Sequence, residues 1–496
     1  MTTNRFVELL SVASLFVCAG AFASTKPNIL YIFTDDQSYR TIGAYEGSRP
    51  WVKTPNIDRL AKEGILFTQA YIGAKCVPSR ANALTGKLQF NIGKRTKRYW
   101  PEDFRRQGYT TGMIGKWHWN IGIDYHQHGT AWDWSVVWDH NQPGEEKTYY
   151  WDQSVNIHGG EAQPLEGYST DRYTDYTIEF IEAQENSDKP WYFWLCYSAI
   201  HGPYTPAARH QGRYRGNPEL PPTRIPEDIF GPRKEKPRHL YDYSAWKLEN
   251  GVPARKGVSL DEYVKEYNEA VIALDEGIGR LIEVLKETGQ LEDTIIVFAS
   301  DQGYAWGEHG LRGKINPYDA AIRGPLIVSN PKRFPSGARC TQPVNGTDLV
   351  RTFHELADVE PGIDLDGRDL TPLLKQPQLE ASWHEDAMIF TYTVHLYDNA
   401  SIEDRIKSKR WESLEYDKHP MPAYLMLHDG RYKYIRYIGE NYIEELYDLH
   451  RDPDELKNMA LRPKHRERLI ALREQTINAF REKGAEFVDL LPPPAM

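Results

Sequence analysis

The sequence predicts an α/β protein in which a large, mostly parallel or mixed β-sheet is sandwiched by helices and followed by a smaller antiparallel sheet with one helix. Three observations predict this fold: continuous apolar runs of strand length, amphipathic segments between them, and a change of pattern towards the C-terminus. The chain has 496 residues, of which 40% are hydrophobic and 26% charged, with a formal charge of −10. This composition indicates a globular protein too long for one core, and the acidic balance argues against nucleic acid as a general partner.

Four apolar runs have the length and continuity of strands that are buried on both faces. In open α/β sheets, ligands bind beyond the carboxyl ends of the strands. Polar residues follow each run, so we expect them to share one site. The runs cover residues 28–33, 111–114, 191–198 and 294–299, and the residues that follow them are Asp35 and Asp36, Lys116 and His118, His201, and Asp301 and Gln302.

Amphipathic patterns at residues 54–64 and 261–287 predict two helices between these strands. Asp275 falls on or near the apolar stripe of the longer helix, where a structural or surface role is favoured over a catalytic one. Residues 202–258 are rich in Pro, Arg and Lys without periodicity, which predicts a long surface excursion.

Beyond about residue 380 the pattern changes to short strands separated by turns. Strand patterns at residues 424–428, 431–437 and 445–449, followed by a helical pattern at roughly 464–483, predict an antiparallel sheet with a closing helix. The predicted organisation is a signal peptide at residues 1–23, an N-terminal α/β catalytic domain at 24–385 and a C-terminal α+β subdomain at 386–496.

The N-terminus has the features of a secretory signal. Arg5 precedes a short apolar stretch that ends in the small-x-small sequence Ala21-Phe22-Ala23. The stretch is too short for a membrane anchor, and Val17 disfavours a lipoprotein site at Cys18. We therefore expect export across the inner membrane to the periplasm or the cell exterior, with no membrane span. In that compartment Cys196 and Cys340 could form one disulfide or remain two buried thiols, and the sequence leaves both open.

Residues 76–80 have the sequence Cys-Val-Pro-Ser-Arg and run on into Leu84-Thr85-Gly86. Pro78 suits the first turn of a helix, which would place Cys76 at the helix N-terminus, where free backbone N–H groups favour an anion. Arg80 lies four residues after Cys76, so one helical turn can bring its guanidinium beside the sulfur. A nucleophile, an anion and a fixed cation would then share one small volume.

The residues Asp35, Asp36, Asp301 and Gln302 offer carboxylate and amide oxygens, and no imidazole or thiolate. Such hard donors suit Ca²⁺ or Mg²⁺ better than zinc. Adjacent residues of a regular strand point in opposite directions, so Asp35 and Asp36 can reach one ion only where the strand gives way to a loop.

The cysteine motif resembles the modification signature Cys-x-Pro-Ser-Arg of the formylglycine-dependent (type I) sulfatases, members of the alkaline-phosphatase-like superfamily. Further matches are Gly115-Lys116-Trp117-His118, His201-Gly202-Pro203 and residues 310–314, and the resemblance covers most of residues 26–375. It implies that a maturation enzyme oxidises Cys76 to formylglycine (3-oxoalanine), whose hydrated aldehyde is the nucleophile. It also implies one calcium ion, held by Asp35, Asp36, residue 76, Asp301 and Gln302.

The resemblance further implies the roles of five catalytic side chains. Arg80 and Lys116 would hold the sulfonate oxygens. His201, helped by Lys314, would protonate the departing sugar oxygen, and His118 would act as the base that expels sulfate.

Two positions depart from the family pattern. Gln302 stands where Asn is commoner, but the amide oxygen is retained, so we expect the metal to be retained. Asn120 stands in place of a glycine, which leaves the shape of that loop open. No histidine follows Asp301 directly, in contrast to the dinuclear phosphatases of the same superfamily.

Export, aromatic content and basic runs favour a sulfated carbohydrate as substrate, in a polysaccharide-degrading bacterium, with an algal galactan such as carrageenan as the specific expectation. Exposed Trp rings would stack on sugars, whereas buried ones would fill the core. The features in question are Trp117, Trp119, Trp132, Trp134 and Trp138, the basic runs at 94–98 and 233–236, and the candidate substrate contacts His309 and Arg312. Two alternatives stay open: a phosphonate or phosphate ester hydrolase using the same formylglycine, and a non-catalytic glycan-binding protein whose Cys76 is never converted.

Overall fold

The computed structural model describes residues 26–93, 98–118, 128–138, 149–379, 387–410 and 422–495, and the backbone alone of 415–416 and 419–420. The predicted signal peptide and the predicted boundary at residues 385 and 386 lie outside these residues, so the division into domains stays a prediction. Among the described residues, no helix combines the length and the apolar character needed to cross a membrane.

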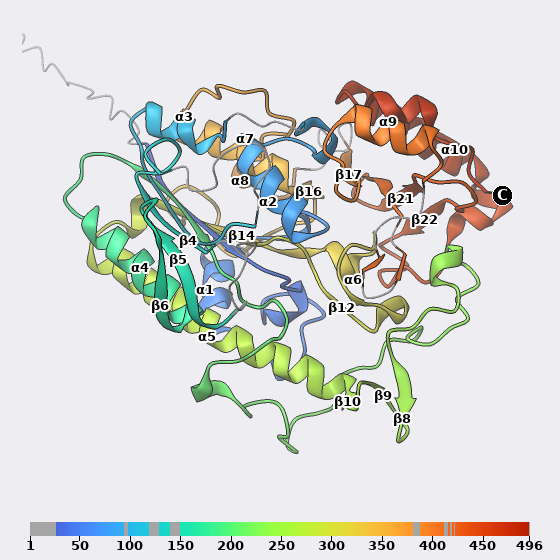
Figure 1. Ribbon diagram of the computed structural model, residues 1–496, viewed down its shortest axis with the longest axis horizontal. Helices are drawn as coiled ribbons and strands as arrows, with labels where there is room; N and C mark the ends of the chain where they lie inside the picture. Colours follow the sequence, from blue (N-terminus) through green and yellow to red (C-terminus); the bar gives the residue numbers. More distant parts are fainter. Residues whose placement is uncertain are drawn as a thin grey trace, which may run out of the picture.

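An 11-stranded mixed sheet forms the centre of the molecule (Figure 1). Its middle is parallel, with the order β11 (Thr294–Ser300), β1 (Asn28–Thr34), β7 (Trp191–Cys196), β3 (Thr110–Lys116) and β4 (Trp134–Trp138). The antiparallel strand β14 (Gly324–Ser329) joins β11 to β2 (Ile65–Tyr71), and β5 (Trp151–Ile157) and β6 (Ala162–Tyr168) extend the other edge antiparallel to β4. The short strands β15 (Ala338–Cys340) and β16 (Val344–Asn345) pair in parallel with β2. The predicted fold class is confirmed.

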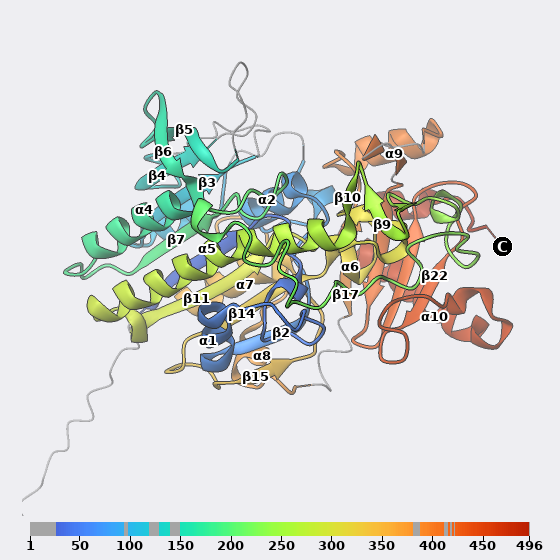
Figure 2. The ribbon, with the colours of Figure 1, turned by 90° about the horizontal axis from the view of Figure 1, so that it is seen from below.

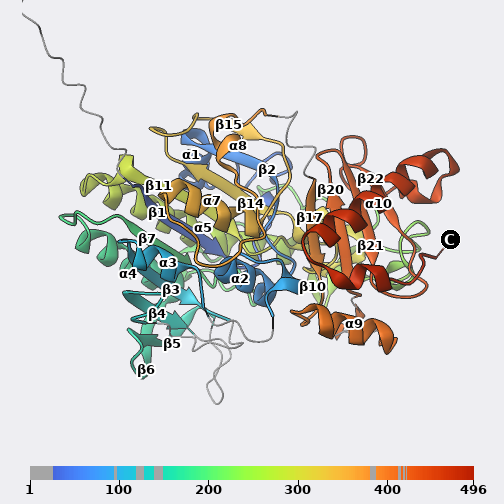
Figure 3. The ribbon, with the colours of Figure 1, turned by 90° about the horizontal axis from the view of Figure 1, so that it is seen from above.

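Helices cover both faces of this sheet, because the side chains of its central strands alternate between two apolar layers. On β1, Leu30 and Ile32 share a core with α1 (Pro55–Glu63), α4 (Ser169–Ala183) and α5 (Leu260–Glu287). The alternate residues of β1 share a core with α2 (Cys76–Thr85), α3 (Pro101–Arg106), α7 (Gly346–Ala357) and α8 (Thr371–Lys375). Figures 2 and 3 show these two layers from opposite sides of the molecule.

Both predicted helices of the large domain are present, as α1 and α5. The longer one begins at a capping box, in which the Ser259 hydroxyl accepts a hydrogen bond from the Glu262 amide and the Glu262 carboxylate accepts one from the Ser259 amide. The buried Asp275 carboxylate accepts hydrogen bonds from the amides of Asn56 (3.1 Å) and Ile57 (2.8 Å) in the first turn of α1. Asp275 is therefore a structural residue, which ties α5 to α1.

A second, four-stranded antiparallel sheet lies beside the end of the large one that carries the site (Figure 1). Its order is β17 (Met388–Tyr392), β20 (Tyr424–His428), β21 (Tyr432–Tyr437) and β22 (Glu445–Asp448), and α10 (Arg466–Glu482) and α9 (Asn399–Lys407) accompany it. The predicted strands and closing helix of this region are confirmed. Its core includes Tyr71, Ala74 and Leu88, which lie on the chain just before and after α2. The small sheet therefore packs against the segments that hold the cysteine motif.

The long segment 202–258 is a surface excursion with little regular structure, as predicted. It contains only the short strands β8 (Lys247–Glu249), β9 (Val252–Arg255) and β10 (Val258–Ser259) and two turns of 3₁₀ helix. Cys196 and Cys340 are both buried and free, so of the two alternatives the structure contains the pair of thiols.

Candidate active site

The predicted carboxylates gather where β1 and β11 end. Asp35, Asp36, Asp301 and Gln302 are each at most 2% exposed. Asp36 has a φ of 60°, so the chain leaves the strand geometry at this residue. The adjacent carboxylates of Asp35 and Asp36 can therefore point to the same side. The Asp36 amide donates a hydrogen bond to Asp301 Oδ1 (2.9 Å), which joins the two strand ends.

Cys76 is the first residue of α2, and its side chain points at these carboxylates. Its Sγ lies 3.1 Å from Asp35 Oδ1 and 3.8 Å from Asp36 Oδ1. It also lies 2.8 Å from Lys314 Nζ and 3.6 Å from Gln302 Nε2. The sulfur therefore stands at the centre of the predicted group of residues, at the N-terminus of a helix.

The Arg80 guanidinium lies one helical turn after Cys76 and is completely buried. Its Nη1 donates a hydrogen bond to the Lys116 carbonyl oxygen (2.8 Å). Its Nη2 lies 3.5 Å from Asp301 Oδ2 and 4.0 Å from Asp35 Oδ2, and makes no hydrogen bond. The guanidinium is thus fixed through Nη1, while Nη2 can still donate hydrogen bonds to a ligand.

Two lysines complete the cationic side of the site. Lys116, the last residue of β3, forms an ion pair with Asp35 Oδ2. Lys314 Nζ lies 2.5 Å from Asp36 Oδ1. Three buried acidic side chains therefore face three buried cations.

The His201 ring follows β7 and lies at the edge of this group. Its Nδ1 lies 2.8 Å from the Gly202 carbonyl oxygen, and its Nε2 lies 3.7 Å from Asp36 Oδ2. Since a carbonyl oxygen only accepts, Nδ1 carries a hydrogen and Nε2 is the atom directed at the site. The ring stacks parallel on Tyr149, with 4.5 Å between the centroids.

The second predicted histidine, His118, lies two residues beyond the end of β3. Its backbone has a φ of 58°, and its side chain is half-buried. The structure thus brings nine of the ten predicted site residues into one connected group: Asp35, Asp36, Cys76, Arg80, Lys116, His201, Asp301, Gln302 and Lys314.

Burial and neighbouring charges set the protonation states of the site. Burial opposes ionisation of Asp35, but the charges of Lys116, His201 and Arg80 hold its pKa well below the usual range. Burial and the charge of Asp35 raise the pKa of Asp301 and also that of the Cys76 thiol. Burial and the charge of Lys116 lower the pKa of His201 to about 4. Cys76 is therefore held as a thiol, which is a weaker nucleophile than a thiolate.

The donor set fits a hard divalent cation. Ligand atoms of Asp35, Asp36, Cys76 and His201 lie within 4.8 Å of one another. The buried Oδ2 of Asp301 accepts no hydrogen bond. The Gln302 amide donates to Asp36 through Nε2, so a rotation of that amide would direct its oxygen at the same space. A cation would satisfy each of these oxygens.

The sequence analysis did not identify two residues that support the site, Tyr149 and Tyr267. Tyr149 supports the His201 ring, and Tyr267 of α5 donates a hydrogen bond from its hydroxyl to the Asp36 carbonyl oxygen (2.6 Å). Tyr267 belongs to the apolar stripe of α5, which hid its polar role. Tyr149 has no sequence signal that we can identify.

One expectation about substrate contacts is wrong, that for His309, whereas that for the half-buried Arg312 stays a prediction. His309 is 1% exposed, and its Nδ1 lies 2.7 Å from Asp228 Oδ2, so it is a buried structural residue. Arg312 donates a hydrogen bond to the Tyr204 hydroxyl (2.9 Å) within a group of aromatic rings.

The aromatic and basic clusters are also largely internal. Trp117, Trp132 and Trp138 are at most 5% exposed and fill the core, so they offer no face to a sugar. In the basic run 233–236, Arg233 and Lys236 are buried and only Lys234 is exposed among the cations. Trp119 and residues 94–97 lie outside the described residues.

Comparison with known proteins agrees with this geometry. The family model named Sulfatase matches residues 27–359, which include every residue of the site. The chain belongs to the sulfatase family. A second model, named N-sulphoglucosamine sulphohydrolase, C-terminal, matches residues 307–483 of this sulfatase. The protein is accordingly an enzyme that hydrolyses sulfate esters.

Individual relatives resemble the sulfatase over most of its length. N-acetylglucosamine-6-O-sulfatase of Bacteroides thetaiotaomicron is 27% identical over 98% of this chain and 93% of its own. Ulvan-active sulfatase of Formosa agariphila is 28% identical over 72% of this chain and 66% of its own. A structure of a protein in complex with its substrate D-glucosamine-2-N,6-O-disulfate has a TM-score of 0.76 at 24% identity, covering 93% of this chain and 99% of that one. This last likeness shows the shared fold.

Proposed function

We propose that this sulfatase removes sulfate from a sulfated carbohydrate through a formylglycine formed from Cys76, with one calcium ion. The observation that carries the proposal is the position of Cys76 Sγ at the N-terminus of α2, 3.1 Å from Asp35 Oδ1 and 2.8 Å from Lys314 Nζ. A protonated thiol at this position is a poor nucleophile, so an unmodified Cys76 does not explain sulfate hydrolysis. Its conversion to a hydrated aldehyde would put a nucleophilic oxygen near the position that the sulfur marks.

The carboxylates of Asp35, Asp36 and Asp301 and the amide oxygen of Gln302 would hold the calcium ion. When bound, the ion would supply a positive charge that favours an ionised hydroxyl on residue 76 and stabilises negative charge on the sulfate group. The chain supplies these ligands from two adjacent strand ends, and the Asp36–Asp301 hydrogen bond fixes their relative position.

The cations of the chain would bind and orient the sulfate group. Arg80 is anchored at Nη1 by the Lys116 carbonyl, so its Nη2 is directed towards the space between Asp35 and Asp301. Lys116 and Lys314 would donate to sulfonate oxygens once the carboxylates that they now contact bind the cation. Because all three are buried, their charges act in a medium of low polarity.

Proton transfer to the leaving group falls to His201 in this proposal. Its Nδ1–H is committed to the Gly202 carbonyl, so Nε2 would deliver a proton to the departing sugar oxygen after the neutral ring, which the low pKa favours, has taken up that proton. Stacking on Tyr149 keeps the ring in that orientation. His118 would act as the base in the second step, in which sulfate leaves residue 76.

The proposed substrate class is a sulfated carbohydrate. The similarity to N-acetylglucosamine-6-O-sulfatase and to ulvan-active sulfatase supports a sulfated carbohydrate as the substrate class. A structural neighbour was solved with k-i-k-neocarrahexaose, at a TM-score of 0.65, which keeps the galactan expectation in the set to be tested. We further propose that the predicted signal peptide directs the chain out of the cytoplasm and that a maturation enzyme converts Cys76.

The first experiment is mass spectrometry of the tryptic peptide that contains residue 76, from protein co-expressed with a formylglycine-generating enzyme. We expect the mass of an aldehyde or its hydrate, and sulfate release from at least one member of a panel of glucosamine, galactan, fucan, ulvan and glycosaminoglycan sulfates. A Cys76→Ala variant serves as the control. Full activity with an unmodified thiol would contradict the proposed nucleophile. Preference for a phosphate or phosphonate ester over the sulfate ester of the same aryl alcohol would favour the alternative hydrolase.

A further inference from the structure

Lys75 and His395 meet beside the nucleophile although they are far apart in the chain. Lys75 immediately precedes Cys76 and is the N-cap residue of α2. Its Nζ lies 3.4 Å from Nε2 of His395, which is exposed on the turn that follows β17 of the small sheet. The segment before α2 and the turn after β17 thus each contribute one basic side chain near Cys76.

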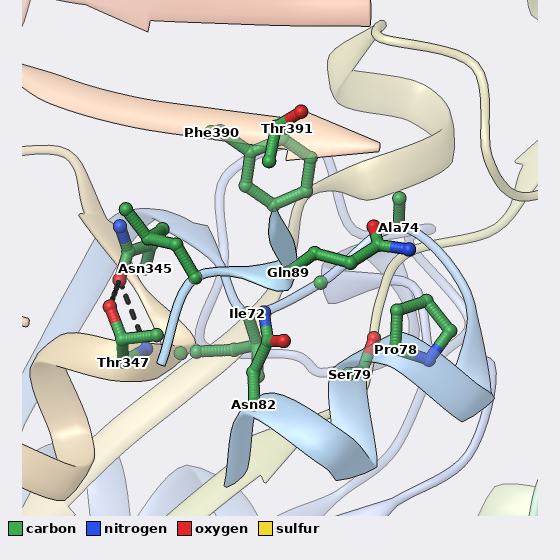
Figure 4. Close-up of a pocket in the computed structure, with 13 residues that line it drawn as sticks. Ile72, Ala74, Pro78, Ser79, Asn82, Gln89, Asn345, Thr347, Phe390 and Thr391 are labelled. Atoms are coloured by element: carbon green, nitrogen blue, oxygen red, sulfur yellow. Dashed lines mark hydrogen bonds between the residues drawn. The ribbon is translucent and has the colours of Figure 1, made fainter. Parts of the chain in front are cut away.

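The turn that carries His395 is firmly attached to the region of α2. The side-chain amide of Gln89 donates a hydrogen bond from Nε2 to the Val394 carbonyl oxygen (2.9 Å). Its Oε1 accepts one from the backbone N–H of Thr393 (3.1 Å). The Gly93 amide donates to the Tyr397 carbonyl oxygen (2.6 Å). Figure 4 shows Gln89 lying between the strand that bears Phe390 and Thr391 and the helix that bears Pro78 and Ser79. The position of His395 relative to α2 is therefore defined by hydrogen bonds at both ends of the turn.

Backbone strain occurs at two β-branched residues that adjoin His395 and Lys314. Val394 has a φ of 63° and Ile315 a φ of 84°, both in the left-handed region, which is strained for β-branched residues. Val394 directly precedes His395, and Ile315 directly follows Lys314. The Ile315 carbonyl oxygen accepts a hydrogen bond from the Tyr424 hydroxyl (2.7 Å), so the small sheet holds this residue too. At each place, a strained residue adjoins a basic side chain beside the site.

Lys75 has no carboxylate partner among the described residues, in contrast to the three cations inside the site. Asp35, Asp36 and Asp301 already face Arg80, Lys116 and Lys314. The half-buried ammonium of Lys75 forms no ion pair within the part of the chain that the structure describes, and its polar neighbour is the His395 ring. A half-buried cation without a charged partner is an arrangement that an anion would satisfy.

We infer that Lys75 and His395 form a subsite for a second acidic group of the substrate, a sulfate or a carboxylate other than the sulfate that is cleaved. Lys75 would supply the charge, and His395 would orient the Lys75 ammonium, because its Nε2 accepts a hydrogen bond from Nζ. The substrate class would then be a sugar with at least two acidic groups, either on one ring or on neighbouring rings. This inference rests on the proposed carbohydrate sulfatase function of the Cys76 site.

The test compares matched sugars as competitive inhibitors of 4-nitrophenyl sulfate hydrolysis. One pair is glucosamine 6-O-sulfate and glucosamine-2-N,6-O-disulfate, with both groups on one ring. The other is the neocarrabiose of kappa- and of iota-carrageenan, in which the second sulfate lies on the neighbouring ring. Where a sugar is itself hydrolysed, its KM replaces the inhibition constant. We expect the disulfated member of at least one pair to bind about tenfold more tightly to the unaltered enzyme.

Lys75→Gln and His395→Asn should each reduce this preference to less than about threefold. Lys87→Gln, which changes a half-buried lysine just beyond the C-terminal end of α2, is the matched control and should keep it. Equal binding of both members of both pairs, or a preference that survives both variants, would overturn the subsite.

Two checks separate this inference from the function on which it rests. Mass spectrometry of the residue-76 peptide corrects each variant for its matured fraction, since Lys75 adjoins the modified residue, whereas His395 does not. If the aryl sulfate is not hydrolysed, calorimetric titration with the same sugars measures the preference directly. Absence of turnover would then contradict the proposed function, while the ratio of affinities still decides the subsite.

Discussion

Replacement of Lys314 by methionine tests how the site balances its charges. The side chain is 3% exposed, and Nζ lies 2.5 Å from Asp36 Oδ1 and 2.8 Å from Cys76 Sγ. Lys314→Met would leave Asp36 buried, with the Gln302 amide as a neutral partner. A buried carboxylate that loses its cation destabilises a protein by about 3–5 kcal/mol. A bound calcium ion would neutralise Asp36 and restore most of that loss.

Thermal unfolding with and without calcium measures this balance. In a chelating buffer we expect Lys314→Met to lower the unfolding midpoint by about 5 °C, since 1 kcal/mol shifts the midpoint of a large domain by about 2 °C or less. Saturating calcium should bring the variant back to within about 2 °C of the unaltered enzyme. In saturating calcium, turnover should stay about 100-fold lower than that of the unaltered enzyme, because a donor to the transition state is lost.

A lysine remote from the site provides the control. Lys265 is buried on α5, with Nζ 2.9 Å from Asp261 Oδ2, so Lys265→Met also breaks a lysine–carboxylate pair. Its loss of stability should not respond to calcium, and its turnover should be retained. A midpoint of Lys314→Met that equals that of the unaltered enzyme in chelator, or one that calcium does not raise, would refute the reasoning.

Three further predictions concern single residues. Gln302→Leu should weaken calcium binding at least about tenfold in calorimetry, whereas Gln302→Asn keeps the amide oxygen and should weaken it less. Burial lowers the pKa of His428 to about 3, and its Nδ1 accepts a hydrogen bond from the Gly430 amide (2.9 Å), so the fold holds the neutral ring. The stability that depends on this neutral ring is complete above pH 6.5 and is lost as the pH falls from 6.5 towards 3. His428→Asn should therefore reduce the loss of unfolding free energy between pH 6.5 and 4.5 by about 2 kcal/mol in urea titrations. His309→Gln should lower the unfolding free energy by about 1–3 kcal/mol through its bond to Asp228 and leave the KM for the sugar unchanged, and a large rise in KM would restore its role as a substrate contact.

The polar ends of the central strands could be predicted because two independent patterns coincide there. A continuous apolar run identifies a strand buried on both faces, and the residues after it must then lie at the sheet edge where ligands bind. Asp35, Asp301 and His201 all follow this rule. The strand β14 has the same fully buried pattern and could have been found in the same way. β6 could not, because four of its seven residues are exposed and only Leu165 and Tyr168 are buried.

Neighbourhood in sequence was a weaker guide than strand ends. His309 lies five residues before Lys314, yet it faces Asp228 rather than the site, because glycines with positive φ at positions 310 and 313 turn the chain between them. The tryptophans at 117, 132 and 138 adjoin strands that are covered on both faces, and composition alone does not distinguish a buried ring from an exposed one. Contacts between distant segments, such as Tyr149 on His201, leave no local pattern at all.

The arrangement of charges explains how one small volume can receive a cation and an anion. In the described structure, Lys116 forms an ion pair with Asp35 and Lys314 forms one with Asp36. These contacts use oxygens and N–H groups that would otherwise bind a cation and an anion. A calcium ion taken up by the carboxylates would release both lysines towards a sulfate group, and a sulfate group drawn to the lysines would release the carboxylates towards calcium. Each ligand would therefore favour the binding of the other, as linkage requires.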